Sequence, residues 1–257
     1  MRKISRRVLF QKAGAAGAVA LTPSIFAEAA TPETVELAQA VTAPSATPPS
    51  SNQPITYIFF NPAEAAFMEA AVARLIPADD RWAGAFEAGA TNYIDKQMAG
   101  AWGTGERLYR SGPWQQGIPG QGYQLQFTPA EEFRAAIGAI NKELTSKGTP
   151  FAKMSPEDQD AFLKALQSSN QDFGGVPGRV FFADLWEMTL EGYFSDPVYG
   201  GNRDMVSWRM IGFPGAYASY YDLVDKHGVR FDRPPMSLAE DAQGHIHPNP
   251  NIPPKLP

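Results

Sequence analysis

The sequence contains no cysteine, and this absence excludes several classes of protein. Without thiols the chain cannot form disulfide bonds in any compartment, nor can it carry the cysteine that anchors a lipoprotein. Covalent haem attachment needs a C-x-x-C-H motif, and iron–sulfur clusters are held by cysteine thiolates. The chain therefore lacks the usual ligands for either redox group.

Positive charge and histidine are also scarce. The 257 residues include 22 Lys and Arg, 27 Asp and Glu and three histidines, with a net charge of -5. No basic patch follows the first dozen residues, so we do not expect nucleic acid as a partner. His245 and His247 lie in a proline-rich segment without a third ligand, so we expect no metal site.

The N-terminal residues 1–29 have the features of an export signal. Arg6 and Arg7 precede a weakly hydrophobic Ala/Gly-rich run, and Ala27 and Ala29 fit a cleavage site of small residues. Paired arginines before such a run are typical of a twin-arginine signal. The run is too short to span a bilayer, which takes about 20 residues. We therefore expect a periplasmic protein with no membrane span of its own.

Charge divides between this leader and the rest of the chain. The leader holds five Lys and Arg against one acidic residue, so the remaining chain carries a net charge of -9. An acidic surface of this kind favours solubility and a partner with basic patches. It disfavours direct binding to an anionic lipid surface.

Composition divides the remaining chain into three segments. Residues 30–53 are rich in Ala, Thr, Pro and Ser and predict a flexible linker. Residues 54–233 carry the helical signals described below. Residues 234–257 are rich in proline and predict an extended tail, either disordered alone or laid across a partner.

Capping motifs and apolar periodicity predict a mainly α fold, a single irregular helical domain with long Gly/Pro-rich loops and extended termini. Asn61-Pro62-Ala63-Glu64 and Thr128-Pro129-Ala130-Glu131 are helix-start signatures, and Ser155-Pro156-Glu157 starts another helix. No strand alternation is evident. The expected helices cover residues 61–76, 85–101, 128–146, a segment beginning at Ser155, 178–190, 203–211 and 215–226.

Residues that could perform acid–base chemistry are present, but no known motif groups them. Asp79 and Asp80 follow a proline, and Asp184 and Glu187 share a predicted helix. The sequence does not bring any two of them to one pocket, and no nucleophile elbow, P-loop or dinucleotide fingerprint follows a strand. We therefore expect this chain itself to be non-catalytic.

Residues 193–215, YFSDPVYGGNRDMVSWRMIGFPG, combine large rings with backbone-permissive residues. Gly200 and Gly201 permit a positive φ angle and close backbone approach. Aromatic residues together with Arg203 and Arg209 have the composition of interface anchors. The same rings could instead fill a core beneath a loop, and composition leaves both interpretations open.

This stretch closely resembles the signature of the gluconate 2-dehydrogenase subunit 3 family. The segment FNPAEAAFMEAAVARLIPADD and the following Tyr93-Ile94-Asp95 are similar to the N-terminal half of that family, so the resemblance spans roughly residues 57–227. It implies a family motif and partner interface comprising Tyr193, Phe194, Asp196, Pro197, Tyr199, Gly200, Gly201, Asn202, Arg203, Trp208, Gly212 and Pro214.

The resemblance implies the small subunit of a membrane-associated, flavin-dependent sugar or polyol dehydrogenase. In such a complex the large subunit carries FAD, with or without an iron–sulfur cluster, and a multihaem cytochrome c subunit carries haem c. The small subunit is expected to bind no cofactor, to stabilise the large subunit and to escort it through the twin-arginine translocase. The sugar is not readable from this chain.

Two alternatives remain. The chain could be an independent periplasmic enzyme or a free periplasmic sugar-binding protein, with Trp102, Trp114 or Trp208 stacking on a sugar ring. It could also be an assembly factor that leaves its partner after export.

Overall fold

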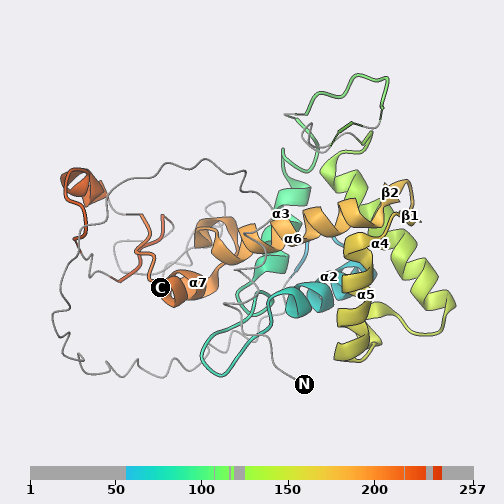
Figure 1. Cartoon of the computed structure of the whole chain (residues 1–257), viewed down its shortest axis with the longest axis horizontal. Helices are drawn as coiled ribbons and strands as arrows, with labels where there is room; N and C mark the ends of the chain where they lie inside the picture. The colour runs from blue at the N-terminus through green and yellow to red at the C-terminus, as the bar shows by residue number, and fades with distance from the viewer. Residues whose placement is uncertain are drawn as a thin grey trace, which may run out of the picture. The chain divides into compact units, whose positions relative to one another are not determined.

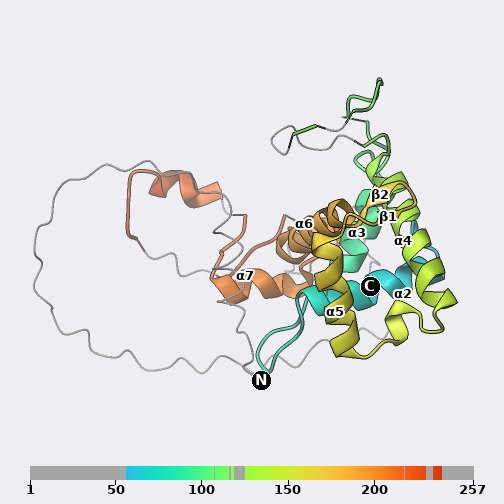
Figure 2. The same cartoon turned by 45° about the vertical axis from the view of Figure 1, so that its right-hand side comes forward.

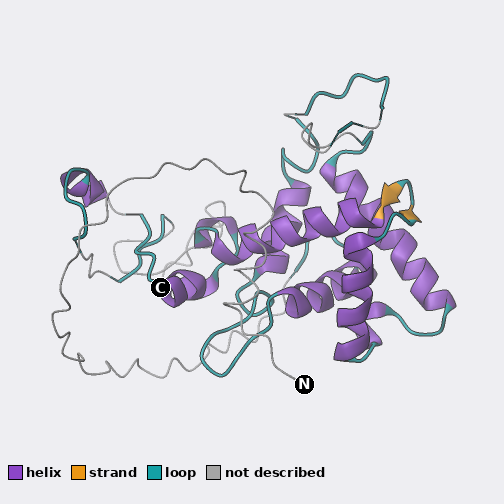
Figure 3. Ribbon diagram, in the orientation of Figure 1, coloured by secondary structure: helices purple, strands orange, loops and turns teal. Residues whose placement is uncertain are grey.

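A computed structural model describes residues 56–106, 108–115, 117–118, 125–216, 218–229 and 234–238. Arg6, Arg7, Ala27, Ala29, the linker and the pair His245 and His247 lie outside these residues, as does most of the predicted tail. The described chain is mainly α, as the sequence predicts (Figure 3). Within this part of the chain, no helix is both long enough and apolar enough to cross a membrane.

Six α-helices and one short hairpin occur in the described residues. The helices are α2 (Pro62–Leu75), α3 (Ala90–Ala99), α4 (Pro129–Ser146), α5 (Pro156–Ser168), α6 (Gly178–Phe194) and α7 (Val206–Ile211). The strands β1 (Asp172–Phe173) and β2 (Val176–Pro177) pair antiparallel. Short 3-10 helices cover Phe151–Lys153, Pro197–Tyr199, Arg203–Met205 and Ala218–Leu223.

The predicted helix starts are confirmed at α2, α4 and α5. Asn61 accepts hydrogen bonds from the backbone of Ala63 and Glu64, and the Glu64 side chain accepts one from the Asn61 backbone. Thr128 and Glu131 form the same reciprocal cap on α4. Each of the three helices has proline in its first turn, where the missing N–H costs nothing.

The core is assembled around α6, which contacts α2, α3, α4, α5 and α7 (Figures 1 and 2). Phe181 of α6 packs edge-to-face on Phe133 of α4 at 5.3 Å between ring centroids. Phe67 of α2 lies 6.2 Å from Phe181 and 4.9 Å from Phe151. All four rings are buried. Burial of this apolar area, together with the ring contacts, joins elements that are distant in sequence.

The segment before α2 is fixed by polar groups from two helices. The buried carboxylate of Asp95 accepts three backbone hydrogen bonds, from Ile58 (2.8 Å), Phe59 (2.9 Å) and Phe60 (2.9 Å). Arg134 of α4 donates to the Phe59 carbonyl oxygen and stacks 4.1 Å above the Phe59 ring. Residues 58–60 therefore belong to the folded core.

The predicted helix 85–101 is shorter in the structure. Residues 85–89 form turns, α3 begins at Ala90, and Gly89 adopts a left-handed φ of 84°. The Ala88 carbonyl oxygen accepts a hydrogen bond from the Arg203 backbone, so its bond is made outside the helix. A contact from a distant segment thus displaces the helix that the alanines favour locally.

The two predicted C-terminal helices also differ from expectation. Within 203–211, Asp204 and Met205 have positive φ angles of 57° and 52°, which confine α7 to its last six residues. Among the described residues of 215–226, the 3-10 helix Ala218–Leu223 is the only helical element. The Ala216 backbone donates to the carbonyl oxygen of Met236, so this segment starts in extended pairing rather than as a helix.

The hairpin β1–β2 was not predicted. Each strand has two residues, too few to show alternation in the sequence. Gly174 and Gly175 form the turn with φ angles of 71° and 94°, which glycine adopts without strain.

Candidate functional site

The family motif folds around the buried side chain of Asn202. Its amide nitrogen donates to the Ser195 carbonyl oxygen at 2.9 Å, and its amide oxygen accepts from the backbone and the hydroxyl of Ser207. Asn202 has a φ of 43°, which asparagine tolerates better than most residues. One side chain therefore connects the end of α6 to the start of α7.

Close backbone approach explains the two adjacent glycines. Gly200 has a left-handed φ of 95°, and its carbonyl oxygen accepts from the Asn92 side chain at 2.8 Å. Gly201 has no such φ, but a β-carbon there would overlap with the carbonyl oxygen of Gly192. Gly192 in turn allows α6 to approach Ala90 of α3. The expected positive φ therefore occurs at one glycine, and the expected close approach at the other.

Two large rings of the motif lie inside the fold. Tyr193 is fully buried, and its hydroxyl donates to the Ala83 carbonyl oxygen at 2.9 Å. The Trp208 indole N–H donates to the Phe194 carbonyl oxygen at 2.8 Å, and only 6% of this residue is exposed. Trp208 is thus unavailable for stacking on a sugar ring, the role that the sugar-binding alternative gives to it.

Asp196 ties the motif to the end of the described chain. We call residues 234–238 the C-terminal strap. The Asp196 carboxylate accepts from the Ser237 hydroxyl at 2.6 Å and from the Leu238 backbone at 2.8 Å. Met236 pairs with Gly215, where a β-carbon would overlap with the Met236 carbonyl oxygen. Residues 236–238 of the predicted tail therefore contact this chain itself.

The motif is more interior than exposed. Buried members outnumber those on the surface, and Tyr199 and Gly212 are the members that are well exposed. Ile211 and Phe213, next to Gly212, are exposed as well. Phe194, Asp196, Arg203 and Pro214 are half-buried. The buried members are Tyr193, Pro197, Gly200, Gly201, Asn202 and Trp208.

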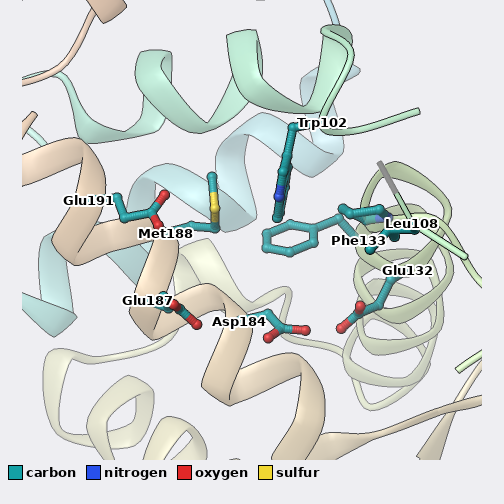
Figure 4. Close-up of a pocket in the computed structure, with 9 residues that line it drawn as sticks. Trp102, Leu108, Glu132, Phe133, Asp184, Glu187, Met188 and Glu191 are labelled. Atoms are coloured by element: carbon teal, nitrogen blue, oxygen red, sulfur yellow. The ribbon is translucent and has the colours of Figure 1, made fainter. Parts of the chain in front are cut away.

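A separate pocket of about 270 Å³ opens between α4, α6 and the turn after α3 (Figure 4). Its walls combine aromatic and aliphatic side chains with four carboxylic acids. The Asp184 and Glu132 carboxyl groups point toward one another, with the Trp102 and Phe133 rings above them in the view of Figure 4. The lining residues are Trp102, Leu108, Pro129, Glu132, Phe133, Asp184, Glu187, Met188 and Glu191.

Burial controls the electrostatics of this pocket. It raises the pKa of the Asp184 carboxyl, the negative charge of Glu187 raises it further, and a hydrogen bond with Glu132 opposes the rise. A hydrogen bond between two carboxyl groups requires a shared proton. Glu191 accepts a hydrogen bond from the Tyr93 hydroxyl at 3.1 Å. Burial and the Glu191 charge raise the pKa of Tyr93, which therefore stays neutral.

Sequence reasoning named Asp184 and Glu187 but missed the other two acids. Asp184, Glu187 and Glu191 lie at i, i+3 and i+7 on α6, a spacing that places them on one helix face. The sequence alone therefore shows that these three acids share one face of the helix. Glu132 comes from α4, and only the fold brings it to the pocket. Asp79 and Asp80 do not line this pocket.

Comparison with protein families decides the classification. The model of the family Gluconate 2-dehydrogenase subunit 3 matches residues 62–215, more than half of the chain. The chain belongs to this family. No curated protein and no solved structure matches it.

The match to the gluconate 2-dehydrogenase subunit 3 family ends at Gly215. It includes α2 to α7, the folded motif and every residue that lines the acidic pocket. The C-terminal strap lies beyond the match, yet it contacts Asp196 and Gly215 within it.

Proposed function

We propose that this chain is the non-catalytic small subunit of a periplasmic, membrane-associated, flavin-dependent dehydrogenase of the gluconate type. Its role would be to stabilise the FAD-bearing large subunit and to escort it through twin-arginine export. The family match over residues 62–215 is the observation that carries this proposal. The leader with Arg6 and Arg7 supports the export role.

The redox groups of the complex are assigned to the other subunits. FAD, with or without an iron–sulfur cluster, would lie in the large subunit, and haem c in a multihaem cytochrome subunit. The absence of cysteine from this chain supports that division, because it leaves no thiolate for either haem attachment or a cluster.

Purification of the complex tests the proposal directly. The tagged full-length chain would be recovered from membranes of its host, followed by an absorbance spectrum and a dye-linked sugar oxidation assay. We expect a flavoprotein in fixed stoichiometry with the chain, together with sugar-dependent dye reduction. A colourless chain recovered alone would refute the stable subunit role and favour a free sugar-binding protein or a transient escort.

The escort role needs its own experiment. Arg6→Lys with Arg7→Lys should leave the large subunit in the cytoplasm, as measured by its activity in periplasmic and cytoplasmic fractions. Arg2→Lys with Lys12→Arg is the matched control, since it changes two leader residues and keeps the arginine pair. Normal export of the large subunit with the Arg6 and Arg7 variant would contradict the escort role.

Timing separates the stable subunit from a transient assembly factor. A transient factor would be found with the large subunit in the cytoplasm and absent from the exported enzyme. A stable subunit would be recovered in the same ratio to the large subunit from the cytoplasm and from the exported enzyme, as measured by quantitative immunoblotting.

A further inference from the structure

We propose that the acidic pocket between α4 and α6 receives the guanidinium group of an arginine side chain presented by a partner protein. The proposed function supplies the dehydrogenase large subunit as that partner, so the partner's identity rests on it. The chemistry of the pocket does not rest on the proposed function, because it follows from the shape, the aromatic walls and the charge of the described residues.

The pocket offers a stacking surface that a protein side chain can reach. Trp102 is 44% exposed and Leu108 39% exposed, so both form an open rim, while Phe133 and Met188 are buried deeper in the pocket. An indole face attracts a flat cation through its quadrupole, and the attraction strengthens when the cation is partly desolvated. A pocket of about 270 Å³ admits a planar group with its aliphatic stem.

Three of the four pocket acids have no Lys or Arg partner in the described part of the chain. None of the pocket's described lining residues is Lys or Arg. In the part of the chain that the structure describes, Asp184, Glu187 and Glu191 form no ion pair with Lys or Arg. Even with one proton shared between Asp184 and Glu132, several negative charges face one cavity. A cation is therefore the complementary ligand.

Two other ligand classes fit less well. Among the described residues, no group of three or more acidic or histidine side chains has the arrangement of a metal site. A neutral polyol could accept the Trp102 ring and donate to carboxylates, but it would leave their charges unbalanced. Desolvated carboxylates without a counter-charge are costly, so a cation is favoured over a polyol.

Arginine suits the pocket better than lysine. Its guanidinium group is planar, stacks on aromatic rings and donates several hydrogen bonds in a fixed fork. Glu187 and Glu191, one helical turn apart, offer two acceptors for that fork, and Trp102 offers the ring. The ammonium group of lysine is more strongly hydrated, and it would interact with the charge of the carboxylates without stacking on the ring or matching the two acceptors.

Fluorine NMR of the full-length chain labelled with 5-fluorotryptophan tests the pocket chemistry. The Trp102 signal is assigned with Trp102→Phe, and the probe is acetyl-arginine amide. The matched probe is acetyl-citrulline amide, which has the same shape and no charge. We expect a saturable shift of the Trp102 signal with the arginine probe and none with the citrulline probe.

Variants tie that shift to the carboxylates. Glu187→Gln with Glu191→Gln should weaken binding of the arginine probe by about tenfold or more, because both charged acceptors for the guanidinium group become neutral. Glu87→Gln with Glu157→Gln, on other surfaces, should leave it unchanged. The pocket chemistry would be overturned by equal shifts with both probes, by no saturable shift, or by a shift with sorbitol alone.

The purified complex tests the partner. We expect the same pocket variant to raise the dissociation constant for the large subunit about tenfold, while the control variant leaves it unchanged. Equal affinities would overturn the docking role even if the free pocket binds the arginine probe. If the wild-type chain forms no complex at all, the proposed function fails, and the NMR result still decides the pocket chemistry.

Discussion

Gly201 lies where the backbone of the motif crosses α6. A β-carbon there would overlap with the carbonyl oxygen of Gly192 and would lie 2.8 Å from the Ser195 hydroxyl. Gly192 lies within α6, and Ser195 is the residue at which that helix ends. Gly201→Ala should therefore lower the free energy of unfolding by about 1–3 kcal/mol, the usual cost of an overpacked site. Urea denaturation followed by circular dichroism measures the change.

Gly138 provides the control for that substitution. It lies on the exposed side of α4, and a β-carbon there would meet no atom within 4 Å. Gly138→Ala should raise the free energy of unfolding by about 0.5–1 kcal/mol, because alanine favours the helix. If both variants lost stability equally, the close approach of Gly201 would not be the cause.

Asp184 predicts a pH-dependent effect. Burial raises the pKa of its carboxyl in the folded chain, so the folded state holds the proton more tightly than the unfolded state. The contribution of this carboxyl to stability therefore falls as the pH rises above 3.8, the ordinary pKa of an aspartate. Asp184→Asn removes the ionisation and should raise the unfolding temperature at pH 7.

Thermal denaturation across a pH series measures that gain. The gain should shrink as the pH falls toward the ordinary pKa, because aspartate then becomes neutral in both states. Asp80→Asn, at an exposed position, is the control. A gain of constant size at every pH would mean that ionisation of Asp184 is not responsible.

Between elements, Asp95 is the main polar connection of α3 to the segment before α2. Its carboxylate accepts three backbone hydrogen bonds, and an asparagine would turn an amide donor toward those donors. Asp95→Asn should lower the free energy of unfolding by about 2–4 kcal/mol, since buried charge-assisted bonds are lost. Urea denaturation measures this, and hydrogen exchange should show faster exchange at the amides of residues 58–60.

The hairpin aspartate is a suitable comparison. Asp172 is exposed and accepts one bond, from the Gly175 backbone, and asparagine can accept it too. Asp172→Asn should change the free energy of unfolding by less than about 0.5 kcal/mol. Losses of similar size at Asp95 and Asp172 would contradict the role assigned to Asp95.

Helix starts were predictable because their signals are local. The caps at Asn61 and Thr128 satisfy groups within three residues, so the sequence contains both partners. The start of α3 was not predictable, because the bond from the Arg203 backbone to the Ala88 carbonyl oxygen joins residues far apart in sequence. Alanine-rich sequence favours helix there, and tertiary contact overrides it.

At the scale of the whole molecule, the candidate sites were also predictable only where their residues lie close together in sequence. The resemblance identified the motif as one unit, but composition left core and interface open, and only the fold places Tyr193 and Asn202 inside. The acids of α6 were readable as one face, whereas Glu132 reaches them from α4. The partners of Asp196 come from a segment whose proline content predicted an extended tail but no contact with this chain itself.

Contacts of the C-terminal strap extend the folded unit beyond the residues whose composition predicts helices. Thermal unfolding of a chain of residues 52–238, which keeps the strap, provides the reference. A chain of residues 52–233 should unfold at a lower temperature, since Asp196 and Gly215 lose their partners.

A double-mutant cycle isolates the strap contact in that comparison. Asp196→Asn should cost about 1–2 kcal/mol in the chain of residues 52–238, where Ser237 and Leu238 donate to the carboxylate. It should cost less in the chain of residues 52–233, where the Val198 backbone is its remaining described donor. Calorimetric unfolding of the four proteins gives the coupling energy. A coupling near zero would mean that the strap does not stabilise the motif through Asp196, and the loss on truncation would then come from the pairing of Met236 with Gly215.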